Sequence, residues 1–410
     1  MGRQTNYNNF APRFGLAYRV SEKTVVRAGY GISIDPSFPD DKYAFNFPVK
    51  QNNAFNAVNT FSAAGSMAAG FAAPLVAAIP PDGVIANAPV GQEYLYLPLN
   101  LKETYLQSWN LAVQRALPAN FTFEAAYVGN HAVGVLTRRN INAGLVPGAG
   151  APGQPLNQLF GRRAVTQTWI RTDTNYNGLQ AKLDRRFSNG FLLTTAYTFG
   201  KAINFADDNG GLFIPAVPSL NRGRAGYDRT HTFVQSYIYE LPFGSKKRWL
   251  QSGFGRWILG DWQVNGILSA YSGQPLDIRI SGTSLNAPGN SNRPNVTGEP
   301  RLLGEIGPGK KWLDISAFSA PSPGTYGTTA RNILNGPRFV NLDFSVFRKF
   351  RMTERVGGEF RFESFNFTNT PHFDRPGGVN GTTLGNADFG EVTTAQADQR
   401  QMQFGLKITF

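Results

Sequence analysis

The sequence predicts an all-β protein whose antiparallel strands cross a membrane as a barrel. Runs of alternating apolar and polar residues recur along the chain, and each spans roughly 9–13 residues. Strands of about five or six residues are usual in soluble proteins, whereas a tilted membrane-spanning strand needs about 9–11. The connections between the runs alternate between short and long, which is typical of membrane barrels.

The composition agrees with a β-rich chain and excludes several other classes. Aromatic residues make up 13% of the 410 residues, and charged residues only 16%, below the roughly 25% of an ordinary soluble domain. The absence of cysteine excludes disulfides and thiolate zinc sites. No apolar run reaches the length of about 18 residues that a membrane helix needs. The formal charge of +13 comes from dispersed lysines and arginines, so no nucleic-acid partner is expected.

Each alternating run has one apolar face and one face of small or polar residues. In the first run, Phe14, Leu16, Tyr18 and Val20 share the apolar face, because side chains two residues apart point to the same side of a strand. About eleven strands are predicted in this way, at 12–20, 24–34, 104–116, 121–129, 175–187, 191–203, 229–241, 260–272, 338–350, 355–367 and 399–410.

The connections assign a side of the membrane to each end of the strands. Tight turns are predicted near 21–23, 118–120, 188–190 and 351–354, with a connection of moderate length at 242–259. Long loops are predicted at 35–103, 130–174, 204–228, 273–337 and 368–398. Short turns of membrane barrels are periplasmic and long loops extracellular, so the long loops are expected outside the cell.

The polar faces of two neighbouring strands carry charges of both signs. Glu359, Arg361 and Glu363 are spaced to lie beside Asp343 and Lys349 of the preceding strand. Opposite charges on one face of a strand pair stabilise each other. We therefore expect these five residues to form a charge ladder in a wet barrel lumen.

The final strand ends on an aromatic residue. Phe404, Leu406, Ile408 and Phe410 alternate along it. This pattern resembles the C-terminal signal that the barrel assembly machinery recognises in bacterial outer-membrane proteins, and it predicts that machinery and outer-membrane lipid as partners.

An ordered set of segments resembles the C-terminal part of Oar-like TonB-dependent transporters, the group with a carboxypeptidase-regulatory-like domain. The matching segments are 8–20, 25–35, 237–244, 271–275, 336–373 and 389–410. The resemblance implies a 22-stranded barrel, a plug inside it and an N-terminal TonB box. This chain shows no plug, TonB box or signal peptide, so residues 1–410 are expected to be a partial barrel domain that supplies the C-terminal half.

The resemblance also implies a function. The intact parent would take up a scarce, unidentified solute across the bacterial outer membrane, with TonB acting only through the missing N-terminal part. The fragment alone is not expected to transport. Ligand contacts are expected in the loops at 35–103 and 273–337, and no catalytic, metal-binding or cofactor-binding residue is expected.

Two alternatives remain open. One is a secreted or surface all-β adhesin or carbohydrate-binding module, in which Leu179, Ala181 and Leu183 would pack beneath a second sheet. The other is a β-propeller enzyme, which would need blade repeats of about 40–50 residues. The unequal lengths of the loops argue against such repeats. The three histidines lie far apart in the sequence, so they give no support to a zinc-dependent enzyme.

Overall fold

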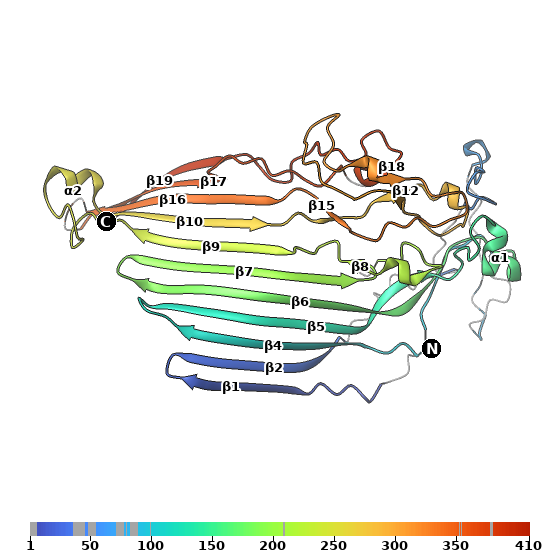
Figure 1. The fold of residues 1–410 in the computed structure, drawn as a ribbon, viewed down its shortest axis with the longest axis horizontal. Helices are drawn as coiled ribbons and strands as arrows, with labels where there is room; N and C mark the ends of the chain where they lie inside the picture. The colour runs from blue at the N-terminus through green and yellow to red at the C-terminus, as the bar shows by residue number, and fades with distance from the viewer. Residues whose placement is uncertain are drawn as a thin grey trace.

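One large sheet dominates the computed structural model, and its long strands follow one another in chain order (Figure 1). The structure describes residues 6–35, 46–47, 55–70, 78, 80–82, 89–98, 100–207, 210–351, 353, 355–377 and 380–410. The eleven long strands are β1 (Arg13–Ser21), β2 (Thr24–Asp35), β4 (Thr104–Ala116), β5 (Phe121–Asn140), β6 (Thr166–Ser188), β7 (Phe191–Asn204), β9 (His231–Glu240), β10 (Trp262–Tyr271), β16 (Phe339–Arg351), β17 (Gly357–Phe365) and β19 (Gln401–Thr409). The predicted all-β antiparallel fold is confirmed, and the described strands form an open sheet with β1 and β19 at its edges.

Short strands and helices lie in the connections between the long strands. The short strands are β3 (Tyr94–Tyr96), β8 (Gly223–Arg224), β11 (Pro275–Leu276), β12 (Arg279–Ile280), β13 (Asn295–Val296), β14 (Phe318–Ser319), β15 (Leu334–Asn335) and β18 (Thr383–Leu384). The helices are α1 (Pro155–Phe160), α2 (Gly253–Leu259), η2 (Met67–Ala69), η3 (Ala151–Gly153), η4 (Pro218–Asn221), η5 (Thr283–Leu285), η6 (Ile315–Ala317) and η7 (Asn380–Thr382). Among the described residues, no helix is long and apolar enough to cross a membrane.

The register places the apolar residues of neighbouring strands on one face of the sheet. Residues directly opposite each other in an antiparallel pair share a face. One such row crosses nine strands through Tyr18, Val26, Val113, Ala125, Ala181, Tyr197, Phe233, Ala270 and Val340. We call this the apolar face and the opposite one the polar face.

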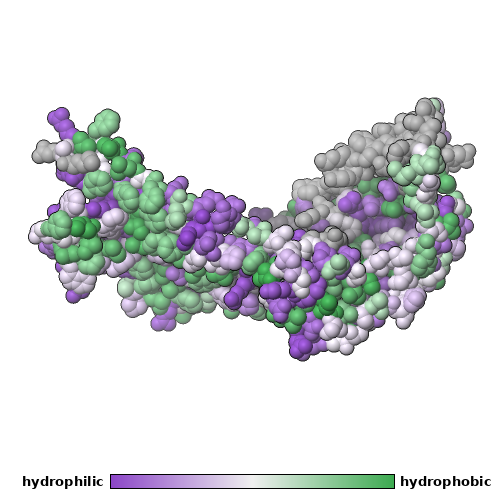
Figure 2. Space-filling model, turned by 90° about the horizontal axis from the view of Figure 1, so that it is seen from above, coloured by the Kyte–Doolittle hydropathy of each residue, from purple (hydrophilic) through white to green (hydrophobic). Residues whose placement is uncertain are grey.

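The apolar face has no protein layer over it in the described part of the chain. Leu179 is 51% exposed and Phe404 is 73% exposed. The sandwich alternative required Leu179 and its neighbours to pack beneath a second sheet, and that arrangement is wrong for the described residues. In the view of Figure 2, hydrophobic residues gather towards the end with the tight turns, whereas the loop end is more hydrophilic and hollowed.

Strands β5 and β6 are longer than the sequence predicted. They span 20 and 23 residues and pair through part of the region predicted as a loop at 130–174. The ladder is irregular between Ala132 and Val135, where Gly134 has a φ of +77°. This bulge interrupts the alternation, which is why the sequence pattern stopped at residue 129.

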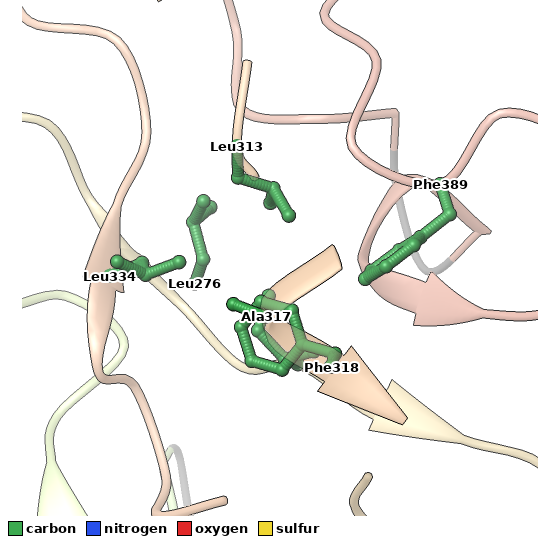
Figure 3. Close-up of a cluster of buried hydrophobic side chains, with 7 residues drawn as sticks. Leu276, Leu313, Ala317, Phe318, Leu334 and Phe389 are labelled. Atoms are coloured by element: carbon green, nitrogen blue, oxygen red, sulfur yellow. The ribbon is translucent and has the colours of Figure 1, made fainter. Parts of the chain in front are cut away.

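The long loops at 273–337 and 368–398 fold together into a compact cap at one end of the sheet, which we call the loop cap. Its core contains seven buried hydrophobic residues, shown in Figure 3, namely Leu276, Ile278, Leu313, Ala317, Phe318, Leu334 and Phe389. Phe318 and Phe389 meet edge to face with ring centroids 6.2 Å apart. The short pairs β11–β15, β12–β18 and β13–β14 join segments that are distant in the sequence.

Truncating this core should open the loop cap. Phe389→Ala removes a ring that is only 3% exposed, and such changes cost about 3–5 kcal/mol. We expect faster hydrogen exchange across 273–337 and unchanged protection in β4–β7, measured by mass spectrometry. Leu303→Ala is the control because that side chain is 51% exposed. Equal exchange in the two variants would contradict an independent core in the loop cap.

Candidate functional site

A cavity of about 360 Å³ lies in the loops at one end of the sheet. Three connections line it, from residues 204–228, 273–337 and 368–398. Its charged lining consists of four arginines and two aspartates, Arg279, Arg293, Arg331, Arg375, Asp207 and Asp277. We call it the arginine cavity.

One carboxylate of the arginine cavity serves two guanidinium groups. Asp277 Oδ1 accepts from Arg293 Nε at 2.9 Å, and Asp277 Oδ2 accepts from Arg279 Nε at 3.2 Å. Both guanidinium groups lie 4.7 Å from the ring centroid of Phe213, close enough for cation–π attraction. The Arg293 side chain is 2% exposed and that of Arg279 is 37% exposed. Arg279 is therefore the member of this pair that faces the open space.

The second carboxylate holds Arg331 in a buried network. Arg331 Nη2 donates to Asp207 Oδ2 at 2.7 Å, and Nη1 donates to Asn204 Oδ1 at 2.6 Å. Arg331 also donates to the backbone oxygen of Asn221, 3.4 Å away. A buried guanidinium needs such partners, because an unpaired charge away from water is costly. Arg331 and Asp207 thus fix the loop at 204–228 against the loop cap.

The side chain of Asn221 shapes that loop from inside. It is fully buried, and its Oδ1 accepts from the Ile214 backbone nitrogen at 2.8 Å. Its Nδ2 donates to the Ile214 oxygen at 2.9 Å. One amide side chain therefore satisfies both backbone groups of Ile214, which have no strand partner, and the segment closes without a regular ladder.

The arginine cavity has an excess of positive charge. Arg375 is exposed and its side chain has no ion-pair partner in the described part of the chain. Among the described lining residues there are four guanidinium groups and two carboxylates, an excess of two positive charges. Guanidinium groups bind carboxylates and phosphates in a planar, two-pronged geometry.

The expected charge ladder is only partly one network. Lys349 lies opposite Glu359 in the register, with Nζ 3.9 Å from Glu359 Oε2. Glu359 also accepts from Arg361, whose guanidinium lies 5.1 Å from the Phe347 ring. Lys349 is 82% exposed, so water and salt screen this pair and it contributes little to stability.

The other two members of the predicted ladder bind elsewhere. Glu363 accepts from the side chain of Gln403 on β19. Asp343 accepts from Asn341 Nδ2 and from the Asn366 backbone nitrogen, both at 2.9 Å. Asp343 therefore lies outside the network of Lys349, Glu359 and Arg361. That network lines a second cavity of about 440 Å³ on the polar face.

The four residues of the predicted assembly signal lie on or directly after the edge strand β19. Phe404 and Phe362 are register partners with ring centroids 5.1 Å apart. Leu406 lies opposite Phe360, and Ile408 opposite Gly358. Phe410 follows the strand and is 96% exposed. The described residues show no partner strand on the outer edge of β19.

Two carboxylates of the loop cap are stabilised in their charged form. The Lys311 ammonium, at 3.0 Å, and the Gly309 backbone N–H, at 3.1 Å, hold the pKa of Glu391 below its ordinary value. The Ser316 hydroxyl and then Arg301 lower the pKa of Asp314 in the same way. Within the described ranges, no group of three or more histidine, aspartate or glutamate side chains could hold a metal ion.

Comparison with known proteins shows the family of the chain. The sequence profile of a family described as an outer membrane beta barrel domain matches residues 1–403. The chain belongs to this family. Its predicted location in the bacterial outer membrane is thereby confirmed, and it is a membrane barrel domain rather than an enzyme. No curated protein sequence matches it significantly.

Several solved outer-membrane receptors match this structure over most of the chain. The pyoverdine receptor FpvA of Pseudomonas aeruginosa PAO1 is 9% identical with a TM-score of 0.47, over 98% of this chain and 36% of the receptor. The ferric preacinetobactin receptor BauA of Acinetobacter baumannii is 10% identical with a TM-score of 0.44, over 97% and 36%. The ferric citrate transporter FecA is 10% identical with a TM-score of 0.43, over 97% and 38%. The chain spans little more than a third of these proteins' length.

Family membership orients the sheet. The apolar face is turned to lipid, the tight turns are periplasmic and the long loops are extracellular, as in outer-membrane barrels generally. The arginine cavity is therefore extracellular. Ligand contacts were expected in the loops at 35–103 and 273–337. Much of 35–103 lies outside the described residues, and the arginine cavity is lined by 273–337 together with 204–228 and 368–398.

The pairing of Glu391 with Lys311 should make the loop cap sensitive to acid. Because the folded-state pKa of Glu391 is lowered, its stabilisation is present above the ordinary carboxyl pKa and lost as pH falls through the lowered value. Amide exchange at 307–312, corrected for intrinsic rates, should accelerate across that interval. Glu391→Gln should remove this step, and Glu305→Gln, in the loop that contains residues 307–312, should keep it. A step that persists in Glu391→Gln would show that another group is responsible.

Proposed function

We propose that this chain forms part of the wall and the extracellular capture loops of a TonB-dependent receptor that takes up a scarce solute. The arginine cavity carries this proposal, because it is an extracellular pocket with uncompensated charge on a membrane barrel. Its volume lies within the range of about 300–1,000 Å³ typical of small-molecule sites. The polar face would line the route inward.

The charge of the cavity defines the class of solute. Arg293 and Arg331 are buried and already paired, so they serve mainly to fix the walls. Arg279 and Arg375 are the guanidinium groups that can reach a ligand. A solute bearing carboxylate or phosphate groups would supply the missing negative charge. The expected ligand is therefore a small organic anion or its metal complex.

The proposed receptor requires more than the described sheet. Strands β1 and β19 each pair on one side only within the described residues. Unpaired strand edges in lipid leave backbone groups unsatisfied. In this proposal the chain acts as the C-terminal wall of a larger barrel, TonB acts through an N-terminal part that carries a plug, and this chain alone does not transport.

Removing the two accessible arginines should weaken anion binding. Each contact of a guanidinium with an anion contributes about 1.5–3 kcal/mol, so Arg279→Ala and Arg375→Ala should each raise Kd by about tenfold or more. Isothermal titration of the full chain in detergent, with citrate and pyrophosphate as probes, measures this. Arg301→Ala is the matched control because Arg301 is 66% exposed and pairs with Asp314 outside the cavity.

Two results would contradict this proposal. One is an unchanged Kd in the double variant Arg279→Ala/Arg375→Ala. The other is binding of a neutral sugar of similar size as tightly as citrate. Either result would remove the anion class while leaving the membership of the barrel family intact.

We further propose that Phe404, Leu406, Ile408 and Phe410 form the signal read by the barrel assembly machinery. The terminal ring is 96% exposed and the edge of β19 is open in the described sheet, so both are accessible to another protein. Deleting Phe410 should lower the yield of membrane-inserted protein, measured by heat-modifiability and membrane fractionation. Deleting Gly2 is the control, and equal insertion of the two variants would count against the signal.

A further inference from the structure

The connection between β9 and β10, residues 241–261, differs from the other described turns at the periplasmic end of the sheet. Strands β1–β2 and β6–β7 are joined by tight turns at 22–23 and 189–190. Residues 241–261 instead form a projecting segment that contains α2, and Figure 1 shows it extending beyond the strand ends. We call this segment the α2 turn.

One face of α2 is strongly apolar and uncovered. Phe254, Trp257 and Ile258 are spaced at i, i+3 and i+4, which places them on the same side of a helix. They are 75%, 70% and 43% exposed. The rings of Phe254 and Trp257 stack with centroids 6.1 Å apart. A water-exposed pair of this size on a short turn is costly unless something apolar covers it.

Contacts to the sheet tilt α2 towards the lipid-facing side. The Trp262 indole Nε1 donates to the Ile258 carbonyl oxygen at 2.8 Å. Arg348, the register partner of Trp262, donates to the Trp257 carbonyl oxygen. Trp262 and Arg348 share the apolar face with Val264 and Val346. The helix is therefore tied to the periplasmic rim of the surface that contacts the bilayer.

The α2 turn is also basic. It carries Lys246, Lys247, Arg248 and Arg256, and its only acidic residue is Asp261. Lys247 binds Glu240 on β9, and Arg256 Nε lies 4.0 Å from Asp261. Lys246 and Arg248 have no acidic partner among the residues that the structure describes, and Arg248 lies over the Trp249 ring at 5.0 Å.

We propose that the α2 turn binds phospholipids of the inner leaflet of the outer membrane. Phe254, Trp257 and Ile258 insert at the boundary between headgroups and acyl chains, and Lys246 and Arg248 contact the headgroup phosphates. Apolar and aromatic residues combined with basic ones characterise helices that lie in a membrane interface. An anionic membrane surface attracts such cations. The ligand class is therefore an anionic phospholipid such as phosphatidylglycerol.

Depth measurements test the insertion. Because the chain has no cysteine, single nitroxide labels at Phe254→Cys and Glu22→Cys report on the α2 turn and on a tight turn at the same end. The full chain is reconstituted in vesicles of phosphatidylethanolamine and phosphatidylglycerol. The label at 254 should collide with oxygen several-fold more, relative to a water-soluble nickel complex, than the label at 22. Equal accessibility at the two positions would overturn the proposal.

Lipid retention tests the role of the charges. Native mass spectrometry of the detergent-solubilised chain should show fewer bound phosphatidylglycerol molecules in Lys246→Ala/Arg248→Ala than in the unchanged protein. Arg301→Ala/Lys310→Ala removes the same charge from the extracellular loops and should retain the normal number. Equal retention in both double variants would overturn the proposal. So would shielding of the label at 254 in native membranes but not in pure lipid, since a protein would then cover α2.

Discussion

Backbone hydrogen bonding in a medium without water is the constraint on which this structure depends. Each N–H and C=O in the hydrocarbon region must find a partner within the protein. The antiparallel ladder from β1 to β19 meets this need for every strand between its two edges. Once the ladder is set, residues directly opposite each other share a face, and the alternating sequence gives the sheet one surface for lipid and one for water.

Hydrophobic side chains meet different surroundings in the sheet and in the loop cap. In the sheet itself, large hydrophobic side chains such as Leu179 and Phe404 remain exposed, because lipid rather than protein surrounds them. In the loop cap the surroundings are water, and there Leu276, Leu313 and Phe389 bury against one another. The protein therefore places its only large core of described residues in the part that sequence analysis treated as loops, and that core holds the walls of the arginine cavity.

The strands could be predicted from the sequence because their pattern is local. A period of two along 12–20 or 399–410 needs no knowledge of distant residues, and β1 and β19 lie where the alternation placed them. The extension of β5 to Asn140 was not predicted, because the bulge at Gly134 interrupts the period of two in the sequence. The five residues of the predicted charge ladder lie on one face of the sheet, but Asp343 binds Asn366 rather than Lys349.

The arginine cavity could not be predicted because its residues come from three loops. Asp277 and Arg293 are 16 residues apart, whereas Arg331 and Asp207 are 124 apart. No spacing rule connects these residues, and the excess of arginine in the composition was the only sign of the cavity in the sequence. Of the three short strand pairs, only β12–β18 joins two of these loops, and each pair involves two residues on each side, which is too little alternation to recognise in a sequence.

The number of strands has a geometric consequence for the open edges. Each of the pairings that link the eleven strands is antiparallel. An odd count therefore makes β1 and β19 run in the same direction, both towards the periplasm. Two copies related by a rotation about the membrane normal would meet as parallel neighbours at both seams. Antiparallel closure instead requires an odd number of additional strands, so self-association of this sheet cannot reproduce a wholly antiparallel barrel.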